Sequence, residues 1–381
     1  MRSGSGVRVK SSRNRLGLVA TAIVLAVLAS LASATAAGAR PSGTPNWTVK
    51  LRHGGTFTLA PSIQDKIKAN KPFNYVFSYG SCSIQGFSQQ YLSGYKTTLP
   101  QANKIYPIHG TSLCPPQTQQ DVNTQINQIT ALLNTNQVDC LSIEPQSSTS
   151  MAALVASTLK KGIPVFTVGL TTFGNEFTNF TQVPLQEGMT AAATTVAYMK
   201  AHNLHFKTFA TSGGDPTQYW AQNRMKGFRL GILKAIPGAK FITTEQHPLT
   251  TTYDPAKTYD AYKAFLSGAG QNVDVIENVD IGAGIAARAL KDAGNAGKAF
   301  STGWNVTPDQ VAALQNGTQI ALYDQNWPQQ AAFGAVACAQ FAKSGKILPN
   351  TQKLTIIDKA NLASAQKKLA DFKTYALTGL V

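Results

Sequence analysis

Residues 137–145 read QVDCLSIEP and residues 161–168 read KGIPVFTV, and these two stretches decide the fold. Each contains a short apolar run, Val138–Ile143 and Pro164–Val168, which has the pattern of a buried strand. A helical pattern fills the residues between them. A strand, a helix and a second strand at this spacing predict a parallel pair joined by a crossover helix.

The same alternation continues in both directions from this block. Further strand candidates are 74–79, 104–109, 208–211, 240–245, 273–278, 299–302 and 320–323. Four strands then fall in the first half of the chain and five in the second. This distribution predicts an α/β protein of two similar doubly wound parallel-sheet lobes, which also suits a chain too long for one core.

The first 39 residues have the pattern of an export signal. Five cations between Arg2 and Arg15 precede the uncharged apolar run Leu16–Leu31, and small residues then alternate up to Ala39. No cysteine stands directly after the run, where a lipid would be attached, so a lipoprotein anchor is not indicated. We expect cleavage near Ala39 and an exported protein, in the periplasm or at the outer face of the cytoplasmic membrane. An uncleaved anchor is the alternative, because a run of this length can nearly span a bilayer.

The chain is basic, with 34 Lys and Arg against 18 Asp and Glu and a formal net charge of +16. Five of these cations belong to the export segment and the others are scattered. The densest cluster, Lys367, Lys368 and Lys373, lies in an amphipathic C-terminal helical pattern, where a solvated helix face explains it. Nucleic-acid binding is therefore not indicated, because it needs a continuous basic stripe.

Four cysteines in an exported chain allow up to two disulfides. Cys82 and Cys114 each follow a strand candidate and lie in a loop, so we predict that they pair. Cys140 lies within a strand and Cys338 within the apolar helical stretch Ala331–Phe341, so we expect both to be buried thiols.

Polar and aromatic residues gather where the strand candidates end. In open α/β sheets ligands bind beyond the carboxyl ends of the strands, so these residues are the candidate site. The strand-end candidates are Ser81, Glu144, Asp215, Asp280, Trp304, Asn305, Asp324 and Gln325.

Two aromatic and two polar residues beside these ends extend the candidate set. Phe87 and Trp220 can stack on an apolar face of a ligand, although core packing is the alternative for either. Arg224 can donate a forked hydrogen bond to a ligand or tie its helix to a neighbouring carboxylate. Gln222 is the competing donor.

These motifs resemble the ribose-type (type I) periplasmic binding proteins over about 280 residues, from Phe73 to about Lys353. The most specific match is 137–145 followed by a helix and 161–168, and weaker matches surround Arg224, Asp280 and Asn305. The resemblance implies three crossings between lobes, near 180–184, 324–326 and 348–353. It also implies this division: export signal 1–39, linker and N-terminal extension 40–72, N-terminal lobe 73–182 plus 326–348, and C-terminal lobe and tail 183–325 plus 354–381.

The sequence departs from this family at four positions of the expected site. Gly169-Leu170 stand where sugar binders often have an Asp-Arg pair, Asn305 replaces an aspartate, and Val279 replaces an asparagine. The hydroxyl-recognition pattern must therefore differ from that of the ribose binders.

Patterns of catalysis, cofactor binding and metal binding are poor. The stretch Gly282–Ala287 superficially fits a dinucleotide fingerprint, but the acidic residue expected about twenty positions later is missing. His202 and His205 stand three apart without further ligands. We therefore expect no enzyme, no cofactor and no metal.

The function that these observations predict is capture of a small polar ligand, a monosaccharide or polyol, for the permease of an ABC importer, by a monomer. One alternative on the same fold is a non-sugar ligand such as a nucleoside, an amide or an aromatic compound. Others are a ligand-sensing partner of a receptor kinase and an exported enzyme.

Overall fold

The structure is a computed structural model that describes residues 45–84, 86–117 and 121–379. The predicted export segment, 1–39, lies outside these residues, as does the first part of the expected linker. Within the described part of the chain, no helix is both long enough and apolar enough to cross a membrane.

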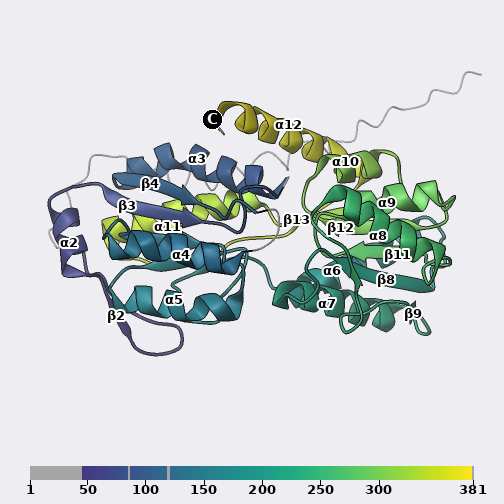
Figure 1. The fold of residues 1–381 in the computed structure, drawn as a ribbon, viewed down its shortest axis with the longest axis horizontal. Helices are drawn as coiled ribbons and strands as arrows, with labels where there is room; N and C mark the ends of the chain where they lie inside the picture. Colours follow the sequence, from purple (N-terminus) through teal and green to yellow (C-terminus); the bar gives the residue numbers. More distant parts are fainter. Residues whose placement is uncertain (1–44, 85, 118–120, 380–381) are drawn as a thin grey trace, which may run out of the picture. The chain divides into compact units, whose positions relative to one another are not determined.

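The first lobe is built on a five-stranded parallel sheet in the order β4-β3-β5-β6-β7. Helices α3 and α11 pack together on one face, and α4 and α5 cover the other (Figure 1). The strands are β3 (Phe73–Ser78), β4 (Ile108–Leu113), β5 (Cys140–Ile143), β6 (Val165–Val168) and β7 (Asn179–Phe180). The helices are α3 (Phe87–Ile105), α4 (Val122–Asn134), α5 (Ser148–Lys160) and α11 (Trp327–Ser344).

The second lobe is built on a larger sheet in the order β10-β8-β11-β12-β13-β14, with β9 also paired to β8. All pairings are parallel except that of β13 with β14. The strands are β8 (Thr208–Gly213), β9 (Lys240–Phe241), β10 (Leu249–Thr250), β11 (Val275–Asn278), β12 (Phe300–Trp304), β13 (Gln319–Asp324) and β14 (Thr355–Ile357). The helices are α6 (Pro184–Ala201), α7 (Tyr219–Ala235), α8 (Pro255–Ser267), α9 (Ala283–Asp292) and α10 (Pro308–Gln315).

Both sheets share one topology, in which the first strand has the next strand of the chain on one side and a later strand on the other; in the second sheet the two short strands β9 and β10 together take the place of that next strand. In the first lobe β3 pairs with β4 and β5, and in the second β8 pairs with β9, β10 and β11. The predicted fold class, two similar doubly wound lobes, is confirmed. This strand order places a switch point beside the first strand of each sheet, where ligands bind in such folds.

The chain passes between the two sheets three times. It leaves the first sheet after β7 and enters α6, it returns between β13 and α11, and it crosses again between α11 and β14. The second passage is the shortest, because only residues 325 and 326 separate β13 from α11.

Short elements flank this arrangement at both ends. A hairpin of β1 (Thr48–Lys50) and β2 (Thr56–Thr58) precedes α2 (Pro61–Lys68). The buried Trp47 ties the hairpin to the first lobe by donating its indole N–H to the Ala342 carbonyl at 3.0 Å. After β14, the turn η1 (Lys359–Asn361) leads into α12 (Leu362–Gly379).

Two strand candidates differ from the structure by more than two residues at an end. The segment predicted at 104–109 is wrong by about four residues, because α3 continues to Ile105 and β4 begins only at Ile108. Of 240–245 only the first two residues are a strand. The Thr243 hydroxyl accepts from the Thr211 N–H and donates to the Thr211 carbonyl, each at 2.7 Å. These side-chain bonds take the place of backbone bonds between two strands at this point.

The structure contains two disulfides. Cys82 and Cys114 are joined, as the sequence predicts. The expectation that Cys140 and Cys338 are thiols is wrong, because these two residues are also joined. Both are fully buried, and α11 crosses the face of the first sheet so that residues 198 positions apart become neighbours. A contact between the last helix of a lobe and an early strand leaves no local sequence signal.

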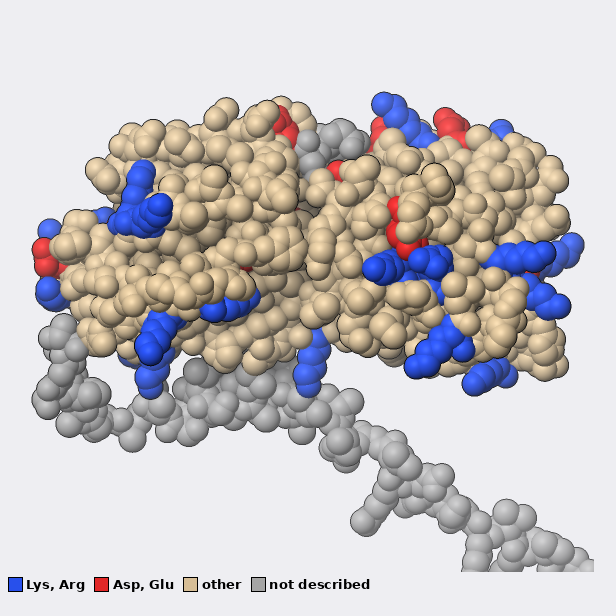
Figure 2. All heavy atoms as spheres, turned by 90° about the horizontal axis from the view of Figure 1, so that it is seen from below, with Lys and Arg blue, Asp and Glu red and all other residues tan. Residues whose placement is uncertain are grey.

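Basic side chains on the face shown in Figure 2 form separate small groups with wide neutral stretches between them. No continuous basic band runs across the described residues of this face, although such a band is what tracking of a phosphate backbone requires.

We predict that the Cys140–Cys338 bond contributes more stability than the Cys82–Cys114 bond. Replacing both Cys140 and Cys338 by alanine should lower the free energy of unfolding by about 3–5 kcal/mol, because the bond closes a very long loop of the unfolded chain. The matched control replaces Cys82 and Cys114 by alanine. Their bond closes a loop of 32 residues, so its removal should cost about 1–2 kcal/mol less. Urea unfolding without reductant measures both. A larger loss for the control pair would contradict the prediction.

Candidate functional site

One cavity has walls from both lobes, at the carboxyl ends of the strands. The space between its walls, including the open mouth, is about 630 Å³. Its lining is Gly80, Ile84, Phe87, Tyr91, Glu144, Gly169, Leu170, Trp220, Arg224, Tyr253, Asp280, Ile281, Asn305, Gln325 and Trp327.

The first lobe contributes an aromatic wall. Phe87 and Tyr91 lie one turn apart at the start of α3, and Trp327 begins α11. The Phe87 ring centroid lies 5.0 Å from that of Tyr91 and 4.9 Å from that of Trp327, and Tyr91 and Trp327 stack at 5.9 Å. Because each ring is held by the other two, the wall is rigid and offers an apolar face to a ligand.

Glu144 places a carboxyl group beside this wall. It follows β5, its side chain is buried, and its Oε2 has no hydrogen-bond partner among the described residues. Burial raises the pKa of Glu144 to about 7, and the Gly80 backbone amide offsets only part of the rise. Near neutral pH this group can therefore donate or accept a hydrogen bond.

Two glycines make room for Glu144. A Cβ at Gly80 would lie 2.7 Å from the Glu144 Oε2 atom. Gly169 has φ of +68°, and a Cβ there would meet the Tyr91 hydroxyl at 2.6 Å. Any larger residue at either position would have to displace the carboxyl group or the aromatic wall.

The second lobe faces this wall with a guanidinium group between two indoles. The carbon centre of the Arg224 guanidinium lies 4.2 Å from the Trp304 ring centroid and 4.9 Å from that of Trp220. Its Nε donates to Glu187 at 2.8 Å, and its Nη1 donates to the Val279 carbonyl at 2.9 Å. Both members of the ion pair are almost fully buried, so the charge of Arg224 is already balanced by the protein.

Asp280, two residues beyond β11, is held by backbone amides. Its Oδ2 accepts from the Gly214 N–H at 2.5 Å and its Oδ1 from the Gly282 N–H at 3.1 Å. Burial raises the pKa of Asp280 to about 6, although these amides oppose the rise. The bonds join the loops after β8 and β11, at the switch point of the second sheet.

Gln325 lies at the second crossing and is bonded from both lobes. With Asn305 it exchanges two hydrogen bonds of 3.2 Å, and its carbonyl accepts from the Gln330 side chain at 2.9 Å. Its side-chain nitrogen donates to Glu187 at 3.4 Å. Asn305 has φ of +66°, a left-handed conformation that asparagine tolerates better than most residues.

Seven of the twelve candidate ligand residues named from sequence line this cavity. They come from three strand ends, two helices and one crossing, and the fold brings them together although 238 positions separate the first from the last. They are Phe87, Glu144, Trp220, Arg224, Asp280, Asn305 and Gln325.

The other five candidates lie outside the lining, and three of them have polar partners of their own nearby. Ser81 organises its own loop by accepting from the Ser83 and Ile84 amides. The carboxylate of Asp215 accepts from the side chains of Thr217 and Gln218. The Gln222 side chain donates to the Pro216 carbonyl at 2.6 Å.

The remaining two, Trp304 and Asp324, lie behind the cavity wall. Trp304 is fully buried against Tyr323, with ring centroids 5.0 Å apart, and its indole ring packs against the Arg224 guanidinium group. Asp324 forms an ion pair with Lys368 of α12. The sequence leaves two roles open for Arg224. Its Nε forms the expected tie to a neighbouring carboxylate, that of Glu187, and its Nη1 bonds the Val279 carbonyl. Its side chain also borders the cavity.

The candidate set omits several lining residues. Tyr91 carries a weak signal, because it stands four positions after Phe87 on the same helix face. Tyr253 lies in an irregular loop after β10 and carries none. Leu170 stands at a position of the expected site, but its apolar side chain gives no hydrogen-bonding signal. Trp327 follows the second crossing, where an aromatic residue fits core packing as well as a ligand wall.

The fold and the cavity are those of a two-lobed binding protein. A family model described as "Periplasmic binding protein domain" matches residues 77–347. The chain belongs to this periplasmic binding protein family. No curated protein matches the sequence.

Solved structures share the fold at low identity. A glucose-galactose binding protein from Geobacillus stearothermophilus aligns with a TM-score of 0.64 and 15% identity over 77% of this chain and 99% of its own. The myo-inositol binding protein of Caulobacter aligns with a TM-score of 0.61 and 17% identity over 78% and 96%. A periplasmic ribose ABC transporter protein from Conexibacter woesei gives 0.64 and 16% over 78% and 95%.

We predict a pH-dependent stability effect for Glu144→Gln. The folded-state pKa of Glu144, about 7, lies above its usual value of 4.5, so the folded protein binds the extra proton and loses stability as pH rises between these values. The variant lacks this loss. Its stability relative to the natural protein should therefore rise by about 2–3 kcal/mol between pH 5 and pH 8.

Urea unfolding of both proteins at the two pH values measures the effect, and each variant serves as its own control across pH. A stability difference that stays constant between pH 5 and pH 8 would show that Glu144 does not titrate in this window.

Proposed function

We propose that this chain is an extracytoplasmic solute-binding protein that captures a monosaccharide or polyol between its lobes for an ABC importer. The observation that carries the proposal is the cavity built from both lobes at the carboxyl ends of their strands. Its aromatic wall suits the C–H face of a sugar ring, and the opposite wall supplies carboxyl and amide groups for hydroxyls. The solved relatives named above bind sugars or myo-inositol, which supports the same ligand class.

Capture follows from the two-lobed construction. A ligand that touches both walls binds the closed arrangement better than an open one, and about 5.5 kcal/mol of preference moves a two-state equilibrium from 1:99 to 99:1. A few hydrogen bonds of ~1 kcal/mol each, together with ring stacking, are sufficient. We propose that the moving units are residues 73–182 plus 326–348 and residues 183–325 plus 354–381.

The remaining parts of the proposal concern setting and partners. The export pattern of residues 1–39 supports a location in the periplasm or at the outer face of the cytoplasmic membrane. Membership of a binding-protein family supports binding without chemical conversion of the ligand, and transfer of the ligand to a membrane permease. We propose that the protein acts as a monomer.

A thermal-shift screen tests the ligand class. Hexoses, pentoses, myo-inositol and nucleosides are each added to the mature protein, because a ligand at 100 times its dissociation constant stabilises the folded state by about 2.7 kcal/mol. We expect at least one sugar or polyol to raise the melting temperature. Stabilisation by nucleosides alone would contradict the proposed class.

We predict that Asp280→Asn lowers the affinity for that sugar or polyol ten- to a hundredfold. The change turns one acceptor at the cavity into a donor and leaves a ligand hydroxyl unpaired, at a cost of about 1–3 kcal/mol. The matched control is Asp215→Asn, because Asp215 lies after the neighbouring strand but outside the lining. Calorimetry should show a loss for the first variant only, and equal affinities would exclude Asp280 from the binding site.

A further inference from the structure

The C-terminal helix α12 lies beyond the region that matches the family model, which ends at residue 347. Its first half packs on the second lobe, where Ala365 is fully buried in a small core with Val306, Leu314 and Ile357. Its axis also runs beside α3 of the first lobe (Figure 1). This helix therefore contacts elements of both lobes.

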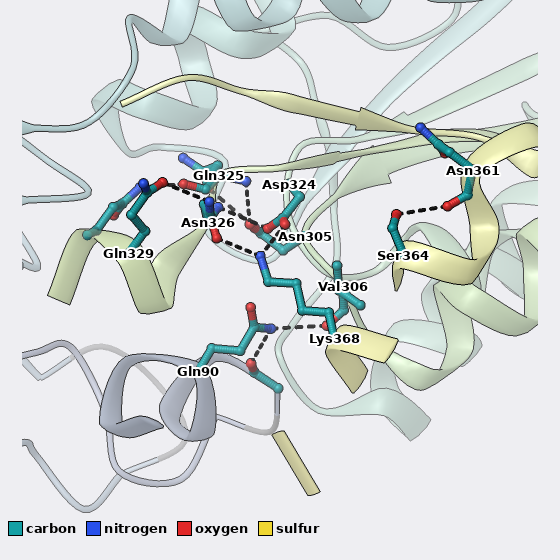
Figure 3. Close-up of polar contacts among 12 residues, drawn as sticks. Gln90, Asn305, Val306, Asp324, Gln325, Asn326, Gln329, Asn361, Ser364 and Lys368 are labelled. Carbon is teal, nitrogen blue, oxygen red and sulfur yellow. Dashed lines mark hydrogen bonds and ion pairs between the residues drawn. The ribbon is translucent and has the colours of Figure 1, made fainter. Parts of the chain in front are cut away.

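Lys368 on α12 reaches the second crossing and is not among the residues that line the cavity. Its ammonium group donates to the Asp324 Oδ2 and, at 2.7 Å, to the Asn326 Oδ1 (Figure 3). The Asp324 side chain is 4% exposed and that of Lys368 is 21% exposed, so the ion pair is largely shielded from water. A shielded pair depends strongly on both partners, because removing one leaves the other charge buried alone.

The two residues that Lys368 binds are the immediate neighbours of Gln325. Asn326 has φ of +61°, and its backbone N–H donates to the Asp324 Oδ1 at 2.9 Å. These contacts define the sharp turn from β13 into α11, and Gln325 is its central residue. The side chain of Gln325 lines the cavity, so the turn geometry sets where that side chain points.

A second contact between the lobes lies on the same small core. The Gln90 side chain of α3 donates to the Val306 carbonyl at 3.0 Å, and Val306 belongs to the cluster that Ala365 completes (Figure 3). The helix α12 thus supports two places where the lobes meet, one through an ion pair and one through packing.

We propose that Lys368 is a positioning residue: by binding Asp324 and Asn326 it fixes the second crossing and holds Gln325 at the cavity wall. Lys368 does not line the cavity and acts only through the turn. The inference concerns the crossing itself, and its test needs no sugar. Its failure is therefore distinguishable from failure of the proposed binding function.

The test is hydrogen exchange of the ligand-free protein, full chain after removal of the export segment, with three variants. Lys368→Met removes the ammonium group and keeps most of the side-chain length. Lys359→Met is the matched control, because Lys359 is exposed on η1 and loses the same charge. Lys368→Arg restores a cation that can pair with Asp324.

We expect the backbone amides of Gln325 and Asn326 to exchange about tenfold faster in Lys368→Met, while amides of the β12 core keep their protection. Lys359→Met should exchange as the natural protein does, and Lys368→Arg should restore most of the protection.

The proposal is overturned if the two amides keep their protection in folded Lys368→Met protein. Equal acceleration by Lys359→Met would also overturn it, because loss of any nearby positive charge would then suffice. A global fall of protection that Lys368→Arg does not restore would assign Lys368 to general stability rather than to the crossing.

Discussion

The backbone turn at Gln325 is the constraint on which the site depends. Only two residues lead from the last parallel strand of the second sheet into a helix that covers the first, so this turn has little freedom. Asn305 bonds Gln325 from the second lobe, and Gln330 bonds its carbonyl from the first. Gln325 is therefore bonded to both lobes, through its side chain to Asn305 of the second and through its backbone carbonyl to Gln330 of the first.

The common topology of the two sheets explains why the remaining site residues converge. In the first sheet the loops after β3 and β5 border the cavity, and in the second sheet the loops after β10, β11 and β12 do so. Gly80 and Glu144 follow β3 and β5, and Tyr253 and Asp280 follow β10 and β11. Loop residues at such a position contribute little to the packing of the hydrophobic core, so they can carry polar groups.

The sequence predicts the fold and about half of the site, and the division has a physical cause. Strand ends are visible as the points where apolar runs stop, which is why Glu144 and Asp280 are found. Whether a side chain at such a strand end borders the cavity or is buried behind it cannot be seen in the sequence. Trp220 borders the cavity, whereas Trp304 lies beneath Arg224 and is fully buried. Tyr253 and the Cys140–Cys338 bond depend on tertiary packing alone, and no local pattern precedes them.

The electrostatics of the cavity favour ligands with hydroxyl groups. Arg224 is neutralised by Glu187, so it offers no free positive charge to an anionic ligand. Burial raises the pKa of Glu144 to about 7 and that of Asp280 to about 6, so near neutral pH Glu144 is present in both its acceptor and donor forms, while Asp280 is mainly an acceptor and gains its donor form as the pH falls. A hydroxyl group both donates and accepts, and it can therefore pair with either form. An ammonium ion on the ligand would pair only with the ionised form of such a group, and a carboxylate only with the protonated form. A neutral polyol therefore matches these two carboxyl groups over the widest range of pH.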